Sequence, residues 1–135
     1  SLEWRLQRLQ QERARIAEHP TDVARAVLAL IEEHLKEAAR RQNFGGNHSG
    51  LRDVLDYLGK RGRFDARIKA QLDAWADVRN CLAHSDMISI APQRATELVN
   101  LAENILKRDA TNAEHLMTGP VATVEARDSV AMARD

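Results

Sequence analysis

Apolar residues recur along the chain at the three- and four-residue spacing that is typical of amphipathic helices. The clearest case predicts a long helix that begins after Pro20 and ends near Gly45 and Gly46. Thr21 is expected to cap this helix, and Asp22 to lie in its first turn. Its apolar positions are Val23, Val27, Leu30, Ile31, Leu35 and Ala38.

A shorter apolar seam precedes this helix and is interrupted by Arg13; it consists of Leu2, Leu6, Leu9 and Ile16. So narrow a stripe predicts a short helix that pairs with another, because helices of this length are marginal on their own. We therefore interpret residues 1–19 as an N-terminal helical arm.

Three further stripes predict helices in the middle of the chain. The first follows a cap at Asn47 or Ser49 and ends at the glycines of residues 59–62; its apolar positions are Leu51, Val54, Leu55 and Leu58. The second is capped by Asp65, and its inward positions are Ile68, Leu72, Trp75 and Leu82. The third starts at Pro92, a favoured first helical residue, and carries Leu98, Leu101, Ala102, Ile105 and Leu106.

Together these elements predict an all-α fold, an antiparallel up-and-down bundle of four to five helices with an extended C-terminal tail. The bundle is assigned to residues 20–109. From Ala110 the pattern changes, because Pro120 is followed by the alternation of a strand at residues 121–124 and then by the start of another helix. A lone strand has no partner in this chain, so residues 110–135 are interpreted as a linker and the beginning of a further module.

The composition is that of a globular protein, with 44% apolar and 30% charged residues. Lys plus Arg (20) balance Asp plus Glu (20), so a polyanion would have to bind a local basic surface. No apolar run approaches the roughly 20 residues of a membrane span, and the single cysteine, Cys81, allows no intrachain disulfide. We expect a cytoplasmic protein without membrane contact, with Cys81 as a small core residue. His34, His48 and His115 lack the spacing of metal ligands, and no cofactor is indicated.

The main candidate for chemistry is the sequence VRNCLAHSD, residues 78–86. An arginine and a histidine with four to six residues between them occur three more times in the chain, at Arg13 and His19, Arg41 and His48, and Arg108 and His115, so the spacing alone carries little weight. Here Asn80 follows Arg79, small or apolar residues precede His84, and a core helix ends. On a regular helix Asn80 and His84 lie about 40° apart, and Arg79 and His84 about 140° apart.

This segment resembles the signature of the HEPN superfamily (higher eukaryotes and prokaryotes nucleotide-binding domains): an arginine, usually a polar residue after it, and a histidine four to six residues further on. The resemblance covers residues 21–108. It implies a metal-independent ribonuclease that acts as a homodimer in a toxin, defence or stress setting, with two copies of the motif facing each other. By position, the catalytic residues would be Arg79, Asn80 and His84.

These side chains suit the reaction that the resemblance implies. A histidine can act as general base near neutral pH and activate a ribose 2′-OH. An arginine can stabilise the negative charge of the pentavalent phosphorus, while Asn80 would orient His84 or the phosphate. The alternative is structural, because a helix C-terminus favours a histidine, and Arg79 can simply pair with Asp77 or Asp86.

A basic cluster bears on the substrate. Around Asp65 the sequence gathers Lys60, Arg61, Arg63, Arg67 and Lys69, and such a cluster attracts phosphates. We predict that the substrate-binding residues are Lys60, Arg61, Arg63 and Arg67. A solvated surface without a ligand is the alternative.

The end of the chain, MTGPVATVEARDSVAMARD from Met117, resembles the opening of a cystathionine-β-synthase-type (CBS) regulatory domain. This resemblance implies an adenine nucleotide bound by an adjoining CBS module; a flexible tail is the alternative. Together the two resemblances imply an endoribonuclease that binds RNA and is regulated by nucleotide. Two other hypotheses stay open: a non-catalytic HEPN module that binds nucleotide or mediates dimerisation, and a plain helical interaction domain.

Overall fold

The computed structural model describes residues 2–42 and 50–118, with side chains as far as residue 111. Within these ranges the chain forms five helices and no strand: α1 (Leu2–Arg13), α2 (Pro20–Arg41), α3 (Leu51–Lys60), α4 (Ala66–His84) and α5 (Pro92–Thr118). The predicted all-α fold is confirmed.

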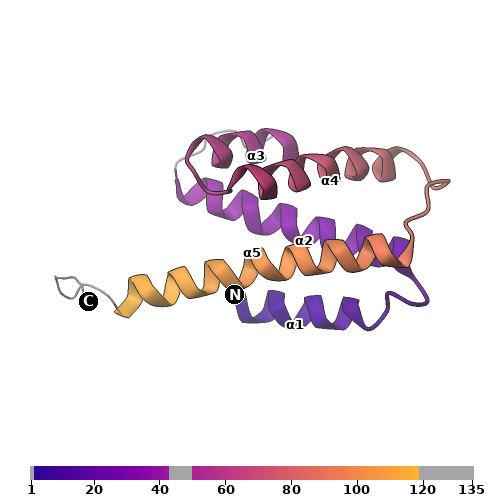
Figure 1. Cartoon of the computed structure of the whole chain (residues 1–135), viewed down its shortest axis with the longest axis horizontal. Helices are drawn as coiled ribbons and strands as arrows, with labels where there is room; N and C mark the ends of the chain where they lie inside the picture. The colour runs from indigo at the N-terminus through magenta and orange to yellow at the C-terminus, as the bar shows by residue number, and fades with distance from the viewer. Residues whose placement is uncertain (1, 43–49, 119–135) are drawn as a thin grey trace.

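Helix α2 lies at the centre of the bundle and contacts each of the other four helices. Figure 1 shows that α1, α2, α4 and α5 alternate in direction along the chain, with the short α3 beside the first turns of α4. Helix α5 packs on α1 and α2, whereas α4 packs on α2 and α3. The molecule therefore has one side built on α1 and α5 and another built on α3 and α4, both joined to α2.

The core consists of the apolar faces that the spacing predicted. Among the fully buried side chains are Leu9, Val27, Leu35, Leu55, Leu58, Leu72, Leu98 and Leu106. Each side chain of this size stabilises the fold by about 1.5–3 kcal/mol relative to full exposure. Every helix contributes to this single core, so the short α1 is held by packing rather than by its own helix propensity.

Two of the predicted helix starts are confirmed. The carboxylate of Asp65 accepts a hydrogen bond of 2.8 Å from the backbone N–H of Ile68 and caps α4. Helix α5 begins at Pro92, as its fixed φ angle favours. Both signals are local, and both predict the observed boundary.

The predicted cap of α2 is wrong. Helix α2 begins at Pro20 with His19 as its N-cap, because proline is preorganised for the first helical position. The hydroxyl of Thr21 instead accepts a hydrogen bond of 2.8 Å from the N–H of Ile90, which ties the start of α2 to the loop before α5. Gly50 is the N-cap of α3, and the predicted caps Asn47 and Ser49 lie outside the described residues.

Helix α5 continues farther than the sequence predicted. Residues 110–118, interpreted as a linker, are helical to Thr118 because they contain neither glycine nor proline. The predicted strand and most of the CBS-like segment, residues 119–135, lie outside the described residues.

A buried group of charged side chains joins α1, α2 and α5 to the turn before α4. His34 Nε2 lies 2.6 Å from Asp109 Oδ2, and Arg63 Nη2 donates to the same oxygen at 2.8 Å. Arg5 Nη1 lies 3.1 Å from His34 Nδ1 and pairs with Glu37 at 3.1 Å. Burial raises the pKa of Asp109, but the hydrogen bonds from His34 and Arg63 outweigh it, so this pKa is lowered overall. Helices α1, α2 and α5 are thus joined by charge as well as by packing.

Candidate functional site

Helix α4 carries Arg79, Asn80 and His84 in its last two turns. Arg79 precedes the buried Leu82 by three residues, so both lie on the side of α4 that faces α2. At this level Arg25 of α2 donates a hydrogen bond of 2.9 Å to the carbonyl of Leu82. That bond satisfies one of the acceptors left free at the end of a helix and ties α4 to α2 beside the motif.

Arg79 forms an ion pair with a buried glutamate of α2. Its Nε atom lies 3.0 Å from Glu32 Oε1, while Lys36 Nζ lies 2.7 Å from Glu32 Oε2. The side chain of Arg79 is 39% exposed and that of Glu32 12% exposed. The Nη atoms of Arg79 make no hydrogen bond within the described part of the chain. Glu32 therefore holds the guanidinium from the side of α2, and the Nη atoms remain accessible to a ligand in solvent.

A groove between α2 and α4, here called the α2–α4 groove, opens beside this ion pair. It consists of two hollows of about 330 and 210 Å³ that share Ala29, Glu32 and Arg79. Its charged lining comprises four cations and two carboxylates, a net charge of +2: Arg25, Lys36, Arg40 and Arg79 against Glu32 and Glu33. The groove is suited to an anion that lies along α2 and touches Arg79.

The other two motif residues lie on a different side of α4. Asn80 and His84 are exposed, and neither lines the α2–α4 groove. Successive residues turn by about 100° around a helix, which leaves His84 about 140° from Arg79. Neither side chain has a hydrogen-bond or ion-pair partner in residues 2–42 and 50–111. The structure therefore brings Asn80 and His84 onto one face, as predicted, but does not bring Arg79 and His84 together within one copy.

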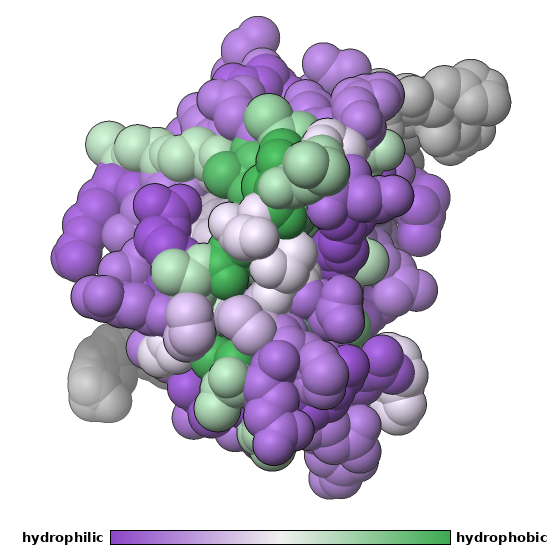
Figure 2. Space-filling view, turned by 90° about the vertical axis from the view of Figure 1, so that its right-hand side faces the viewer, coloured by the Kyte–Doolittle hydropathy of each residue, from purple (hydrophilic) through white to green (hydrophobic). Residues whose placement is uncertain are grey.

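The loop that follows His84 exposes apolar side chains. Met87 is 90% exposed, whereas Ile88 and Ile90 are partly buried against the core. Figure 2 views this end of the bundle and shows a broken band of hydrophobic residues across an otherwise hydrophilic surface. The motif thus ends at a face that combines an open histidine with exposed apolar groups.

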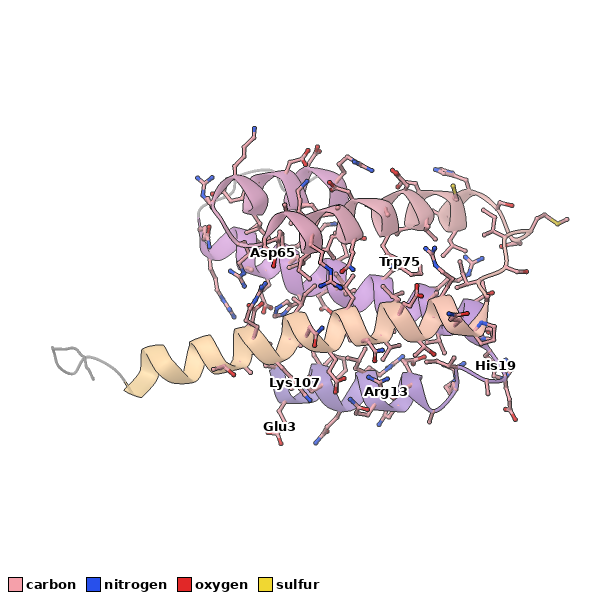
Figure 3. The ribbon with its side chains drawn as sticks, viewed as in Figure 1. Glu3, Arg13, His19, Asp65, Trp75 and Lys107 are labelled. Carbon is pink, nitrogen blue, oxygen red and sulfur yellow. The ribbon has the colours of Figure 1, made fainter. Side chains whose placement is uncertain are left out.

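The predicted substrate-binding cluster lies at the other end of α4. Asp65 and His19 lie at opposite ends of the bundle (Figure 3), and the 19 residues of α4 span about 28 Å. Lys60 and Arg67 are exposed, and Arg61 lies over the ring of Tyr57 at 3.8 Å. These cations are therefore far from the motif and cannot contact the same phosphate as Arg79.

Two members of the basic cluster have internal partners. Arg63 donates to the buried Asp109, and its side chain is only 25% exposed. Lys69 bridges Asp73 and Asp56 at 2.8 and 3.0 Å, and these carboxylates raise its pKa. The contacts of Arg63 thus give it a structural role in the bundle, and its part in substrate binding stays a prediction.

Some features of this site were missed or misjudged from the sequence. Cys81 is exposed, not a core residue, because it lies on the outward side of α4. Glu32 and Arg40 were not singled out. The available signal was a charged stripe on α2 that contains one small residue and repeats at helical spacing: Arg25, Ala29, Glu32, Lys36 and Arg40.

Within residues 2–42 and 50–118, no helix has an apolar stretch long enough to cross a membrane. Among the described side chains, no three His, Cys, Asp or Glu residues gather as a metal site would require. Comparisons of the chain with protein-family models, with curated proteins and with solved structures find no match.

Proposed function

We propose that this protein is a HEPN-like endoribonuclease whose active site forms between two copies of the chain. The observation that carries the proposal is the arrangement of the motif: Arg79 is held accessible in a cationic groove, and His84 is exposed on a different side of the same helix end. Both groups are accessible, and both belong to the residue types that metal-free RNA cleavage requires.

A second copy is required because Arg79 and His84 of one copy lie about 140° apart on α4. In a two-fold symmetric dimer the same patch contacts itself, so the arginine of one copy can face the histidine of the other. The exposed Met87 and the apolar band at this end of the bundle provide a surface that such an association would cover. Formation of the proposed dimer would thus complete the active site and bury the apolar loop at the same time.

The proposed reaction needs no metal. His84 takes the proton of a ribose 2′-OH, and the oxygen attacks the adjacent phosphorus. Arg79 donates hydrogen bonds to the phosphoryl oxygens as their negative charge increases. The bond to the 5′-oxygen breaks, and this oxygen takes up a proton from water, to which His84 later returns the proton that it removed. The products are a 2′,3′-cyclic phosphate and a 5′-hydroxyl, and Asn80, one turn before His84, orients the imidazole or the phosphate.

A second candidate function is a non-catalytic module that binds nucleotide or mediates dimerisation. It is favoured by the separation of the α2–α4 groove from His84, because the groove can hold a phosphate without any contact with the histidine. On either proposal, an adenine nucleotide bound by a CBS module after Met117 would regulate the bundle through α5.

RNA cleavage in the presence of EDTA tests the proposal. The full chain should cut single-stranded RNA and leave 2′,3′-cyclic phosphate ends, and His84→Gln should abolish cutting without lowering the melting temperature. His19→Gln is the matched control, because His19 is also an exposed histidine at this end of the bundle. Cutting that persists in His84→Gln, or that is lost equally in His19→Gln, would overturn the assignment. Nucleotide that raises the melting temperature of a chain that leaves RNA intact would favour the second function.

A further inference from the structure

The α2–α4 groove extends well beyond the motif. Arg25 lies at one end of its lining and Arg40 at the other, and the separation of 15 positions corresponds to about 22 Å along α2. Stacked nucleotides repeat about every 3.4 Å along a strand, so this length can accommodate several of them. Arg79 lies between the two ends, because it lines both hollows.

The charges of the groove are arranged for a chain of phosphates rather than for a single ion. Glu32 is already paired with Arg79 and Lys36. Arg40 is exposed and has no hydrogen-bond or ion-pair partner among the described side chains. Arg25 uses one Nη atom on the carbonyl of Leu82, which fixes the guanidinium and leaves its other N–H groups. Positive groups thus stand at both ends of the groove as well as at its centre.

We propose that the α2–α4 groove binds the phosphate backbone of RNA on one side of the cleaved bond, with Arg40 and Lys36 at one end, Arg25 at the other and Arg79 between them. The inference rests on the proposed function, which supplies the RNA, and adds a binding subsite that the motif does not include. Glu32 acts here as a positioning residue, because it holds Arg79 and Lys36 against the floor of the groove.

Helix α2 offers a closely matched pair of residues for a test. Arg40 and Arg41 are neighbours on the same turn and carry the same charge, but only Arg40 lines the groove. Arg41 pairs with Glu37 and its side chain is 75% exposed. The variants Arg40→Gln and Arg41→Gln therefore change the net charge of the chain equally, but only Arg40→Gln removes a cation from the groove, whereas Arg41→Gln removes an exposed ion pair with Glu37 outside it.

Fluorescence anisotropy with a short single-stranded RNA measures this binding. The RNA carries 2′-O-methyl groups, so the attacking hydroxyl is blocked and the full chain binds without cutting. Arg40→Gln should weaken binding several-fold and reduce the slope of log K against log salt by about 0.7, the value for one phosphate contact on a single strand. Arg41→Gln should leave both quantities as in the wild type. Equal effects of the two variants, or no effect of either, would overturn the groove assignment.

The failure of this inference and the failure of the nuclease proposal can be told apart. If cutting depends on His84 but falls equally in Arg40→Gln and Arg41→Gln, the groove proposal is refuted and the nuclease proposal stands. If RNA binding depends on Arg40 but unmodified RNA is not cut, the groove proposal stands and the nuclease proposal is refuted. ATP binding that depends on Arg40, with no binding of the oligonucleotide, would overturn RNA as the ligand of the groove.

Discussion

The Nε atom of Arg79 lies 3.0 Å from Oε1 of Glu32, although the two residues belong to different helices. The orientation of Arg79 is therefore determined by α2 as well as by α4. The orientation of His84, five residues later, depends only on the end of α4. The two groups proposed for catalysis are thus positioned by different parts of the bundle, and they can be disturbed separately.

Glu32→Gln is predicted to reduce cleavage while leaving the fold intact. The amide keeps the shape of the side chain but loses the charge that holds Arg79, and a displaced catalytic group can cost up to about 100-fold in rate. The loss should appear in kcat more than in KM, because Arg79 acts mainly on the transition state. Glu18→Gln, at an exposed glutamate outside the groove, is the control. A Glu32→Gln enzyme with wild-type kcat would show that the ion pair does not position Arg79.

Asp109→Asn is predicted to lower the free energy of unfolding near neutral pH by about 3 kcal/mol, the usual cost of breaking a buried ion pair. Asp109 is 7% exposed and accepts from both His34 and Arg63. Its pKa is lowered in the fold, so its contribution is present above the ordinary value of 3.8 and is lost as the pH falls through the lower folded value.

Urea denaturation of the wild type and Asp109→Asn checks this prediction. The difference between the two should be large near neutral pH and should shrink as the pH falls below 3.8. A difference that persists unchanged in strong acid would mean that the ionised carboxylate is not what stabilises the fold.

Arg63 and Lys60 are predicted to behave differently although both belong to the basic cluster. Arg63→Gln should lower the free energy of unfolding by about 1–3 kcal/mol, because it leaves Asp109 with one charged partner fewer. Lys60→Gln, at an exposed residue, should change stability by less than about 0.5 kcal/mol and weaken RNA binding only. Equal stability of the two variants in urea would refute the division of the cluster into structural and exposed cations.

Met87→Asp is predicted to dissociate the proposed dimer. A charge at this 90% exposed position would be buried without a partner if the motif end is the interface. Trp4→Asp changes the other large exposed apolar residue of the described chain, on α1, and should leave the dimer intact. Sedimentation velocity distinguishes the two, with circular dichroism as the check on folding. A dimer lost only in Trp4→Asp would place the interface on α1 instead.

The helices and their core could be predicted from the sequence because both depend on local periodicity. Each of these signals depends on only a few neighbouring residues: the apolar stripe on α3, the cap Asp65 and the start of α5 at Pro92. The pairs of Glu32 with Arg79 and of His34 with Asp109 could not be predicted in this way. They join residues 47 and 75 positions apart, and only the packing of α4 and α5 on α2 brings them together.

The same limit applies to the site. Helical geometry predicted that Asn80 and His84 share a face, and they do. It also predicted a wide angle between Arg79 and His84, but it gave no information about what lies on either side of α4. The structural role of Arg63 could not be predicted for the same reason, because a sequence cluster of cations does not reveal a buried carboxylate 46 residues away.

Mixing two inactive variants tests the central claim most directly. Arg79→Ala and His84→Ala should each fail to cut RNA, but a mixed dimer would contain one site with the arginine of one copy and the histidine of the other. After exchange of subunits, half of the dimers are mixed and each has one complete site of two, so cutting should recover to about a quarter of the wild-type rate. No recovery, in a mixture shown to exchange subunits, would contradict a site shared between copies.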